Sequence, residues 1–314
     1  MDEAMTPQEL KDAIMRLKKE KNAVVMAHYY QREEIQEVAD YIGDSLALAQ
    51  YAAKTDADVI VMCGVHFMAE TAKILCPDRK VLIPDLNAGC SLADSCNPTE
   101  FEKFVKEHPD HTVISYVNTS AAVKALTDIV VTSGNARKIV DSLPEDEKII
   151  FGPDRNLGGY INSVTGREML LWQGACHVHD RFSLEKIVEL KEAHPEAKIL
   201  VHPECRKPLR IIADKVGSTA ALLDYARQSD AKEFIVVTES GILFEMQRKC
   251  PEKIFIAAPA EDSECQCNEC EYMKLNTLRK LYECMRDECP EIIVDKEVAR
   301  KAIRPIKRML ELSK

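Results

Sequence analysis

The chain has 314 residues, 46% of them hydrophobic, and a formal net charge of −10. This length and apolar fraction suit two or three folded domains with real cores. The acidic balance and the lack of a long basic run argue against general nucleic-acid binding, and no stretch approaches the ~20 consecutive apolar residues of a membrane span. The first residues, acidic and then helical, are unlike a signal peptide, so the 12 cysteines favour metal or redox roles in a reducing, cytoplasmic compartment over disulfides.

The predicted elements alternate between strand and helix along the chain. A capping box from Thr6 to Glu9, with proline at the first helical position, predicts a helix to about Lys19. Continuous apolar runs at 23–28, 112–117 and 198–203 predict strands buried on both faces of a parallel sheet. Each is followed by a predicted helix (32–42, 120–129, 205–216), a second helix (45–54, 133–143, 218–228) and a late apolar strand (81–84, 169–172, 255–258). The tail at 296–312 predicts an amphipathic helix, bent near Pro305, that docks on the first domain.

One unit occurs three times in this pattern. Asp40, Asp128 and Asp214 stand at equivalent places, 88 and 86 residues apart, and a fixed long period indicates a repeated supersecondary unit. We therefore expect an α/β protein of three homologous αβα sandwich domains with parallel sheets, packed about a pseudo-threefold axis. The expected boundaries are an N-terminal helix at 1–18, domains at 19–104, 105–190 and 191–292, and a C-terminal helical tail at 293–314.

Each copy ends in a loop that carries cysteine. The first has Cys90, the second Cys176, and the third a Cys265, Cys267 and Cys270 cluster. If the domains pack about a threefold axis, three thiolates face one point, and three thiolates with one open position suit a [4Fe-4S] cluster. Spacing alone does not exclude zinc, nor does it choose among the three cysteines of the last loop, two of which could instead form a redox-sensitive thiol pair.

Two histidines follow the second of these cysteines. We interpret His177 and His179 as loop packing or support for a ligand rather than as ligands themselves.

Polar residues stand where apolar ones would serve a purely structural role. Ligands of open parallel sheets bind at the carboxyl ends of strands, which predicts a shared central site at His28, Tyr30, Tyr116, Asn118, His202 and Glu204. Hydroxyl residues at equivalent strand-to-helix positions predict three helix N-termini facing the same cavity: Ser45, Ser133, Ser218 and Thr219. Simple N-capping explains any one of them, but three together suit a phosphorylated or multiply carboxylated substrate.

With these residues in place, the chain resembles the quinolinate synthases over nearly its whole length. The resemblance is carried by eight motifs in order: HYYQ at His28, GDS at Gly43, FMAE at Phe67, YVNTS at Tyr116, FGPDRNLG at Phe151, HPEC at His202, VGST at Val216 and MKLNTL at Met273. It implies three αβα domains around a [4Fe-4S] cluster held by Cys90, Cys176 and Cys270, with one open iron position. The last loop reads CxCxxC where some members carry CxxCxxC, so a regulatory disulfide inferred from that form is in doubt here.

The resemblance also implies the reaction, which is condensation of iminoaspartate with dihydroxyacetone phosphate to quinolinate, phosphate and two waters. Tyr30, Tyr116, His202 and Glu204 are the expected catalytic residues. Substrate binding is expected at His28, Ser45, Tyr116, Asn118, Ser133, His202, Glu204, Ser218 and Thr219. An aspartate oxidase or dehydrogenase would supply iminoaspartate, and no nucleic-acid or membrane partner is expected. The alternatives are another [4Fe-4S] hydro-lyase and a zinc-stabilised binding module.

Overall fold

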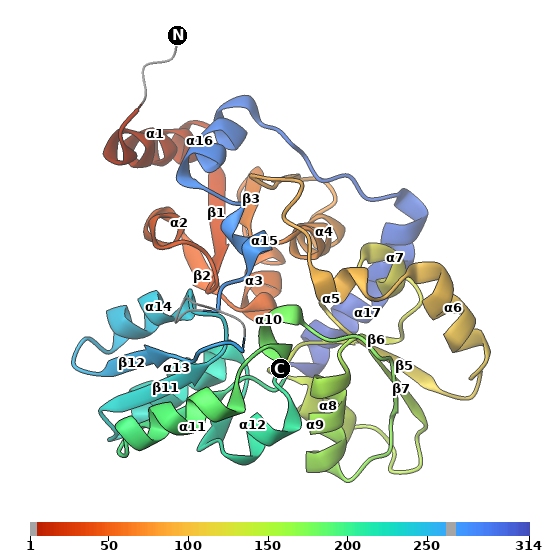
Figure 1. Cartoon of the computed structure of the whole chain (residues 1–314). Helices are drawn as coiled ribbons and strands as arrows, with labels where there is room; N and C mark the ends of the chain where they lie inside the picture. Colours follow the sequence, from red (N-terminus) through yellow and green to blue (C-terminus); the bar gives the residue numbers. More distant parts are fainter. Residues whose placement is uncertain (1–4, 262–267) are drawn as a thin grey trace.

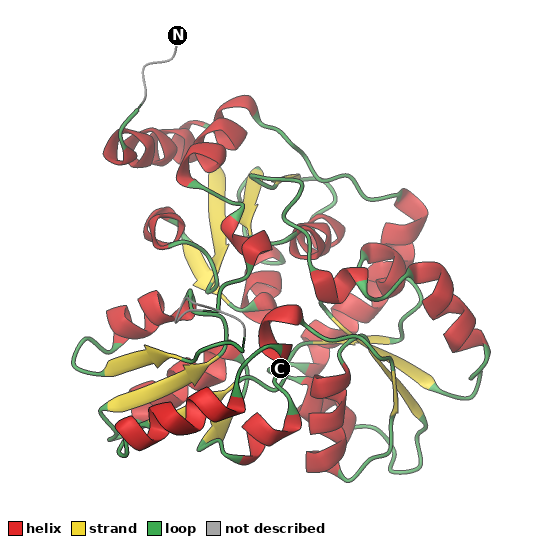
Figure 2. Cartoon of the chain, in the orientation of Figure 1, coloured by secondary structure: helices red, strands yellow, loops and turns green. Residues whose placement is uncertain are grey.

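Three small parallel sheets, each flanked by helices, surround a common centre in the computed structural model (Figures 1 and 2). The structure describes residues 5–261 and 268–314. Within them every pairing between named strands is parallel, so the predicted α/β class with three αβα sandwich units is confirmed. Among the helices of this described part, none combines the length and apolar character needed to cross a bilayer.

The first unit follows the N-terminal helix α1 (Pro7–Glu20), whose Thr6–Glu9 capping box is formed as predicted. Its elements are β1 (Ala23–His28), α2 (Glu33–Val38), β2 (Tyr41–Gly43), α3 (Ser45–Ala52), β3 (Val59–Cys63), α4 (His66–Leu75) and β4 (Lys80–Leu82). The one-turn helix α5 (Ser91–Asp94) and α6 (Pro98–Lys106) lead into the second unit.

The second unit repeats this order. Its elements are β5 (Thr112–Tyr116), α7 (Ala121–Lys124), β6 (Ile129–Val131), α8 (Ala136–Asp141), β7 (Ile149–Gly152), α9 (Arg155–Thr165), β8 (Leu170–Leu171), α10 (His177–Asp180) and α11 (Leu184–Ala193).

The third unit and the tail complete the chain. Their elements are β9 (Lys198–Val201), α12 (Lys207–Ile211), β10 (Lys215–Val216), α13 (Thr219–Gln228), β11 (Glu233–Val237), α14 (Ile242–Lys249), β12 (Ile254–Ala257), α15 (Glu271–Lys274), α16 (Leu278–Asp287) and α17 (Lys296–Leu312).

The strand order is the same in all three sheets: β2-β1-β3-β4, β6-β5-β7-β8 and β10-β9-β11-β12. The central strands β1, β5 and β9 are buried along almost their whole length, as expected for strands covered on both faces. The carboxyl ends of the strands in all three sheets point toward the centre of the molecule (Figure 1). Parallel sheets bind ligands at this end of their strands.

An aspartate at one repeated position closes the first crossover of each unit. The Asp40 carboxylate accepts the N–H of Val25 at 2.8 Å, and the Asp40 N–H donates to the Val25 carbonyl at 2.8 Å. The same double contact joins Asp128 to Val113 and Asp214 to Ile199. Because this pairing adds a short strand beside the first one, the predicted helices at 32–42, 120–129 and 205–216 end early, and β2, β6 and β10 follow.

The last helices cross between units. The sequence assigns residues up to 292 to the third domain, but α16 packs its apolar face on α1 and on the first sheet, where Leu281 and Cys284 join the cluster of Ile14 and Val25 (Figure 1). The helix α17 runs through Pro305 and contacts α4 of the first unit, where the tail is predicted to dock, and also α7 and β6 of the second. An apolar helix face binds whatever apolar surface is near, which a repeat pattern does not encode.

Candidate active site between the three sheets

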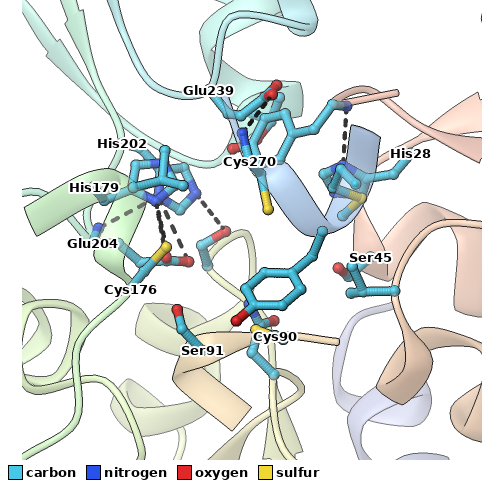
Figure 3. A pocket seen from close by; sticks show the side chains of 18 of the residues that line it. His28, Ser45, Cys90, Ser91, Cys176, His179, His202, Glu204, Glu239 and Cys270 are labelled. Atoms are coloured by element: carbon cyan, nitrogen blue, oxygen red, sulfur yellow. Dashed lines mark hydrogen bonds and ion pairs between the residues drawn. The ribbon is translucent and has the colours of Figure 1, made fainter. Parts of the chain in front are cut away.

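One cavity lies where the carboxyl ends of the three sheets meet (Figure 3). All but one of the predicted site residues line it: His28, Tyr30, Ser45, Cys90, Tyr116, Asn118, Ser133, Cys176, His202, Glu204, Thr219 and Cys270. The exception is Ser218, which is buried just behind the lining and caps α13 by accepting the N–H of Ala221. Residues more than 240 positions apart in the chain thus share one space, as the repeat predicts.

Three cysteines enter this cavity in the same way. Cys90, Cys176 and Cys270 are each the N-cap residue of a one-turn helix, α5, α10 and α15, and their side chains point into the same space (Figure 3). Burial, followed by the charge of neighbouring thiols and carboxylates, raises the pKa of Cys90 to about 12. Burial likewise raises the pKa of Cys270 to about 11 and that of Cys176 well above its usual range. Thiolates at this place therefore require a cation, which is how metal binding couples to thiol ionisation.

The other described cysteines lie elsewhere. Six are buried in the cores, namely Cys63, Cys76, Cys96, Cys205, Cys250 and Cys284, and Cys289 is exposed. Cys265 and Cys267 lie outside the described residues, so their exclusion as ligands and their pairing as redox thiols stay predictions.

Two histidines at equivalent strand ends are held as one tautomer. The N–H of Tyr30 donates to His28 Nδ1 at 3.1 Å, and the N–H of Glu204 donates to His202 Nδ1 at 3.4 Å. With Nδ1 as acceptor, the ring proton sits on Nε2, and His202 Nε2 lies 3.2 Å from the Ser133 hydroxyl. Burial lowers the pKa of both rings to about 3, against the opposing charge of Glu204. Both rings are therefore neutral N–H donors at neutral pH.

A carboxylate and a phenol meet across two units. The Tyr116 hydroxyl donates to Glu204 Oε1 at 2.5 Å, and His179 Nδ1 lies 3.0 Å from Glu204 Oε2. Burial works to raise the pKa of Glu204, but the adjacent His179 and His202 and the hydroxyl of Tyr116 hold it below its usual range. Burial and the charge of Glu204 raise the pKa of Tyr116 well above its usual range. The carboxylate is thus an ionised acceptor and the phenol a proton-bearing donor.

Tyr30 closes a hydrogen-bonded chain through all three units. Its hydroxyl lies 2.8 Å from Thr219 Oγ1 and 2.7 Å from Thr238 Oγ1, and Thr238 Oγ1 lies 2.9 Å from His179 Nε2. The chain therefore runs from Tyr30 through Thr238 and His179 to Glu204 and then to Tyr116. Such a chain can move protons between groups that do not touch.

Two members of this chain were not predicted from the sequence. Sequence reasoning assigned His179 to loop packing or support, yet its ring is almost fully buried and bridges Glu204 and Thr238. Thr238 follows β11 at the repeat position that is glycine in the other two units, Gly64 and Gly152. That break in the repeat is the signal that could have singled it out.

The hydroxyl residues lie at helix starts in two units only. Ser45 and Thr219 are the first residues of α3 and α13, so their helix N-termini face the cavity. The predicted start of the corresponding helix at Ser133 is wrong, because α8 begins at Ala136 after a turn in which Asn135 Oδ1 accepts the N–H of Thr132 at 2.6 Å. Ser133 still lines the cavity from that turn.

Asn118 offers an unused acceptor. Its Oδ1 is buried and has no hydrogen-bond partner within the described residues. The backbone on either side of Asn118 is held by the buried Lys124 ammonium, which donates to the carbonyls of Val117, at 2.7 Å, and Thr119. A buried amide oxygen without a partner is costly, so a ligand with an N–H or O–H group suits this place.

A second metal geometry overlaps the cysteine site. One donor atom each from Cys176, His179 and Glu204 lies within 4.8 Å of the others. Hydrogen bonds already account for this approach, since His179 Nδ1 lies 3.3 Å from Cys176 Sγ and Nε2 contacts Thr238. The three-cysteine set and this mixed set share Cys176, so they are alternatives.

Comparison with known proteins identifies the lineage. A family model described as "Quinolinate synthetase A protein" matches residues 12–311. The chain belongs to this family. It is 60% identical to the quinolinate synthase of Microcystis aeruginosa over 307 residues, covering 98% of this chain and 96% of the relative. It is 58% identical to the quinolinate synthase of Chloroherpeton thalassium over 306 residues, covering 98% of this chain and 95% of the relative. The predicted family and the prediction that the chain is an enzyme are confirmed.

Proposed function

We propose that this chain is the quinolinate synthase of an NAD biosynthetic route, and that it condenses iminoaspartate with dihydroxyacetone phosphate. The products are quinolinate, phosphate and two waters. Family membership over 98% of the chain carries the proposal. The meeting of three cysteine loops and six polar strand ends in one cavity supports it independently. An aspartate oxidase or dehydrogenase is the class of enzyme that would supply the unstable imine.

A [4Fe-4S] cluster fits the donor set of this cavity. Cys90, Cys176 and Cys270 come from three separate loops and face one space, which suits a three-thiolate cluster better than the paired CxxC units of structural zinc. Burial first, and then the charges of Glu204, Cys90 and Cys270, raise the pKa of Cys176. When bound, such a cluster supplies an iron with an open position that acts as a Lewis acid on a substrate oxygen. The family finding favours this reading over the zinc-stabilised binding module.

The neutral histidines and the hydroxyl groups would hold the anionic substrates. Nε2–H of His28 and His202, the Ser133 hydroxyl and the N-termini of α3 and α13 present donors to one cavity. Donors of this kind bind carboxylates and phosphate without adding a titrating charge. The unpartnered Asn118 oxygen would accept the imine N–H or a hydroxyl of the substrate.

Glu204, Tyr116 and Tyr30 would handle protons. Glu204 is the ionised base of the cavity, and the two tyrosines keep their protons because burial and the charge of Glu204 raise the pKa of each. The hydrogen-bonded chain through Thr238 and His179 links Tyr30 to Glu204. A proton that Glu204 takes from a substrate carbon can therefore be balanced by a proton that Tyr30 gives to a substrate oxygen.

Product formation tests this proposal. The chain, purified and reconstituted without oxygen, is mixed with dihydroxyacetone phosphate and iminoaspartate made in place from oxaloacetate and ammonia, and quinolinate is quantified. Quinolinate and phosphate in equal amounts support the condensation. Dehydration of simple hydroxy acids without any quinolinate would instead favour another [4Fe-4S] hydro-lyase.

A further inference from the structure

A buried carboxylate in the lining of the cavity holds one cysteine by its backbone. Glu239 follows β11 and is completely buried. Its Oε1 accepts the N–H of Cys270 at 3.0 Å (Figure 3). Its Oε2 accepts the N–H of Gly241 at 2.7 Å. The carboxylate therefore fixes the backbone at Cys270, from which the third thiol enters the cavity.

A lysine connects this carboxylate to the first unit. Lys274, at the end of α15, places Nζ 3.0 Å from Glu239 Oε1, and its side chain is only 10% exposed. The same ammonium donates to the carbonyl of Tyr30 at 2.7 Å. A second hydrogen bond joins the same two segments in the opposite direction, because Arg32 Nε donates to the Lys274 carbonyl at 2.9 Å.

The turn that carries Tyr30 is also pressed against the third unit. A Cβ built on Gly241 would lie 2.7 Å from the carbonyl carbon of Tyr30 and 2.8 Å from Glu239 Oε2. The side-chain amide of Gln36 spans this contact, donating to the carbonyls of Tyr29 at 3.1 Å and Gly241 at 3.0 Å. Backbone from two units thus meets at Glu239 with no room for a side chain between.

We propose that Glu239 and Lys274 form a positioning pair that locks the backbone of Cys270 and the Tyr30 turn into one rigid arrangement. Glu239 lines the cavity, but its hydrogen bonds run to the backbone of Cys270 and Gly241 and to the Lys274 ammonium, which in turn holds the Tyr30 carbonyl, so we assign the pair to positioning Cys270 and Tyr30. The inference rests on the proposed function, because it assigns the pair to a cluster ligand and a proton-handling phenol of that reaction.

Chemistry favours a positioning role over mere packing. Burying an ion pair gives little net stability, whereas removing one partner leaves an uncompensated charge, so for this pair the geometry that it fixes is a better explanation than stability. Lys253 provides the contrast within the same unit. It is comparably buried, at 6% exposure, but its ammonium donates to the carbonyls of Ala226 and Ser229 at the end of α13.

The experiment compares Lys274→Met with Lys253→Met in the cluster-loaded enzyme. The first readout is the rate at which an iron chelator removes iron under argon, and the second is kcat in wild-type and Tyr30→Phe backgrounds. We expect Lys274→Met to lose iron about tenfold faster or more, the usual scale for a lost supporting contact, while Lys253→Met follows wild type. We also expect Lys274→Met to lower kcat about tenfold in wild type and less than about twofold in the Tyr30→Phe background, because coupled positions are not additive.

Glu239→Gln gives the same comparison if Lys274→Met does not fold, since it keeps the side-chain shape and removes the charge. Equal iron loss in Lys274→Met and Lys253→Met, or kcat losses that simply multiply with Tyr30→Phe, would overturn the proposal. A wild-type chain that retains no iron would count against the proposed function, and this is seen before any variant is compared.

Discussion

The hydroxyl of Tyr116 lies 2.5 Å from Oε1 of Glu204, and this contact joins the end of β5 to the loop after β9. The two residues come from the strand ends of different repeats. The repeat position of Tyr116 is occupied in the third unit by His202, and Glu204 lies two places further along the chain. One bears a proton and the other a charge, so a pseudo-symmetric frame carries an asymmetric donor and acceptor at its centre. Such a pair places a proton donor and an ionised acceptor side by side at one edge of the cavity.

Replacing Glu204 by Gln should suppress turnover and leave the metal content unchanged. The amide keeps the shape but cannot take a proton, and loss of a positioned base costs about 10²–10⁴-fold in rate. Quinolinate formation and iron content are measured on the same sample. Glu233→Gln, a carboxylate paired with His194 away from the cavity, is the matched control and should stay active. Near-normal turnover of Glu204→Gln would remove this residue from the chemistry.

Alanine at Cys90, Cys176 or Cys270 should abolish cluster retention, because each is expected to supply one of three thiolate ligands. Cys96→Ala is the control for the first loop, since Cys96 is only 1% exposed and packs in a core with Phe101. Cys265→Ala should also retain iron. Iron and sulfide are quantified after identical anaerobic reconstitution. Dependence of iron binding on Cys265 would show that the third ligand is assigned to the wrong cysteine.

Gly241→Ala should damage the site without touching a side chain that reacts. The added methyl group would meet the Tyr30 backbone and Glu239 at under 3 Å, and such overpacking costs about 1–3 kcal/mol. We expect a lower melting temperature and a lower kcat. Gly159→Ala in α9 meets nothing within 4 Å, so it should be neutral or stabilising by up to about 1 kcal/mol. Identical behaviour of the two variants would contradict the close approach.

His28 should make the protein less stable as the pH falls. Its folded pKa is lowered to about 3, while an unfolded histidine titrates near about 6.5, so the unfolded state binds more protons between these values. Stability is therefore lost as pH falls below about 6.5, by about 2 kcal/mol near pH 5.

Chemical denaturation of His28→Gln at about pH 7.5 and about pH 5 tests this dependence. The variant should lose less stability on acidification than wild type, because it lacks the buried ring whose pKa is lowered in the folded state. An unchanged acid dependence in His28→Gln would show that the buried ring does not resist protonation.

The repeat in the sequence predicted which residues the pseudo-threefold symmetry brings together. It did not predict the contacts that depend on side-chain packing between the units. Tyr30, Asn118 and Glu204 could be placed in one cavity because equivalent strand ends must converge when three units pack about an axis. His179 could not, since the direction of a side chain on the one-turn helix α10 depends on its partners Glu204 and Thr238, which are remote in sequence.

The same limit applies to the domain boundaries. The amphipathic pattern of α16 identifies a helix with one apolar face, but not the sheet that this face covers. Leu281 packs in one cluster with Ile14 of α1 and Val25 of the first unit. The start of α8 was predicted too early because Asn135, not Ser133, supplies the oxygen that closes the turn at Thr132.

We propose that Cys90, Cys176 and Cys270 hold one cluster with an iron open to substrate. Iron and sulfide quantification together with Mössbauer spectra of the anaerobically purified chain, with and without quinolinate, tests it most directly. We expect about four irons and four sulfides per chain, with one iron site changed by quinolinate. A colourless protein with a single zinc, unchanged by anaerobic reconstitution, would contradict it and favour the mixed site of Cys176, His179 and Glu204.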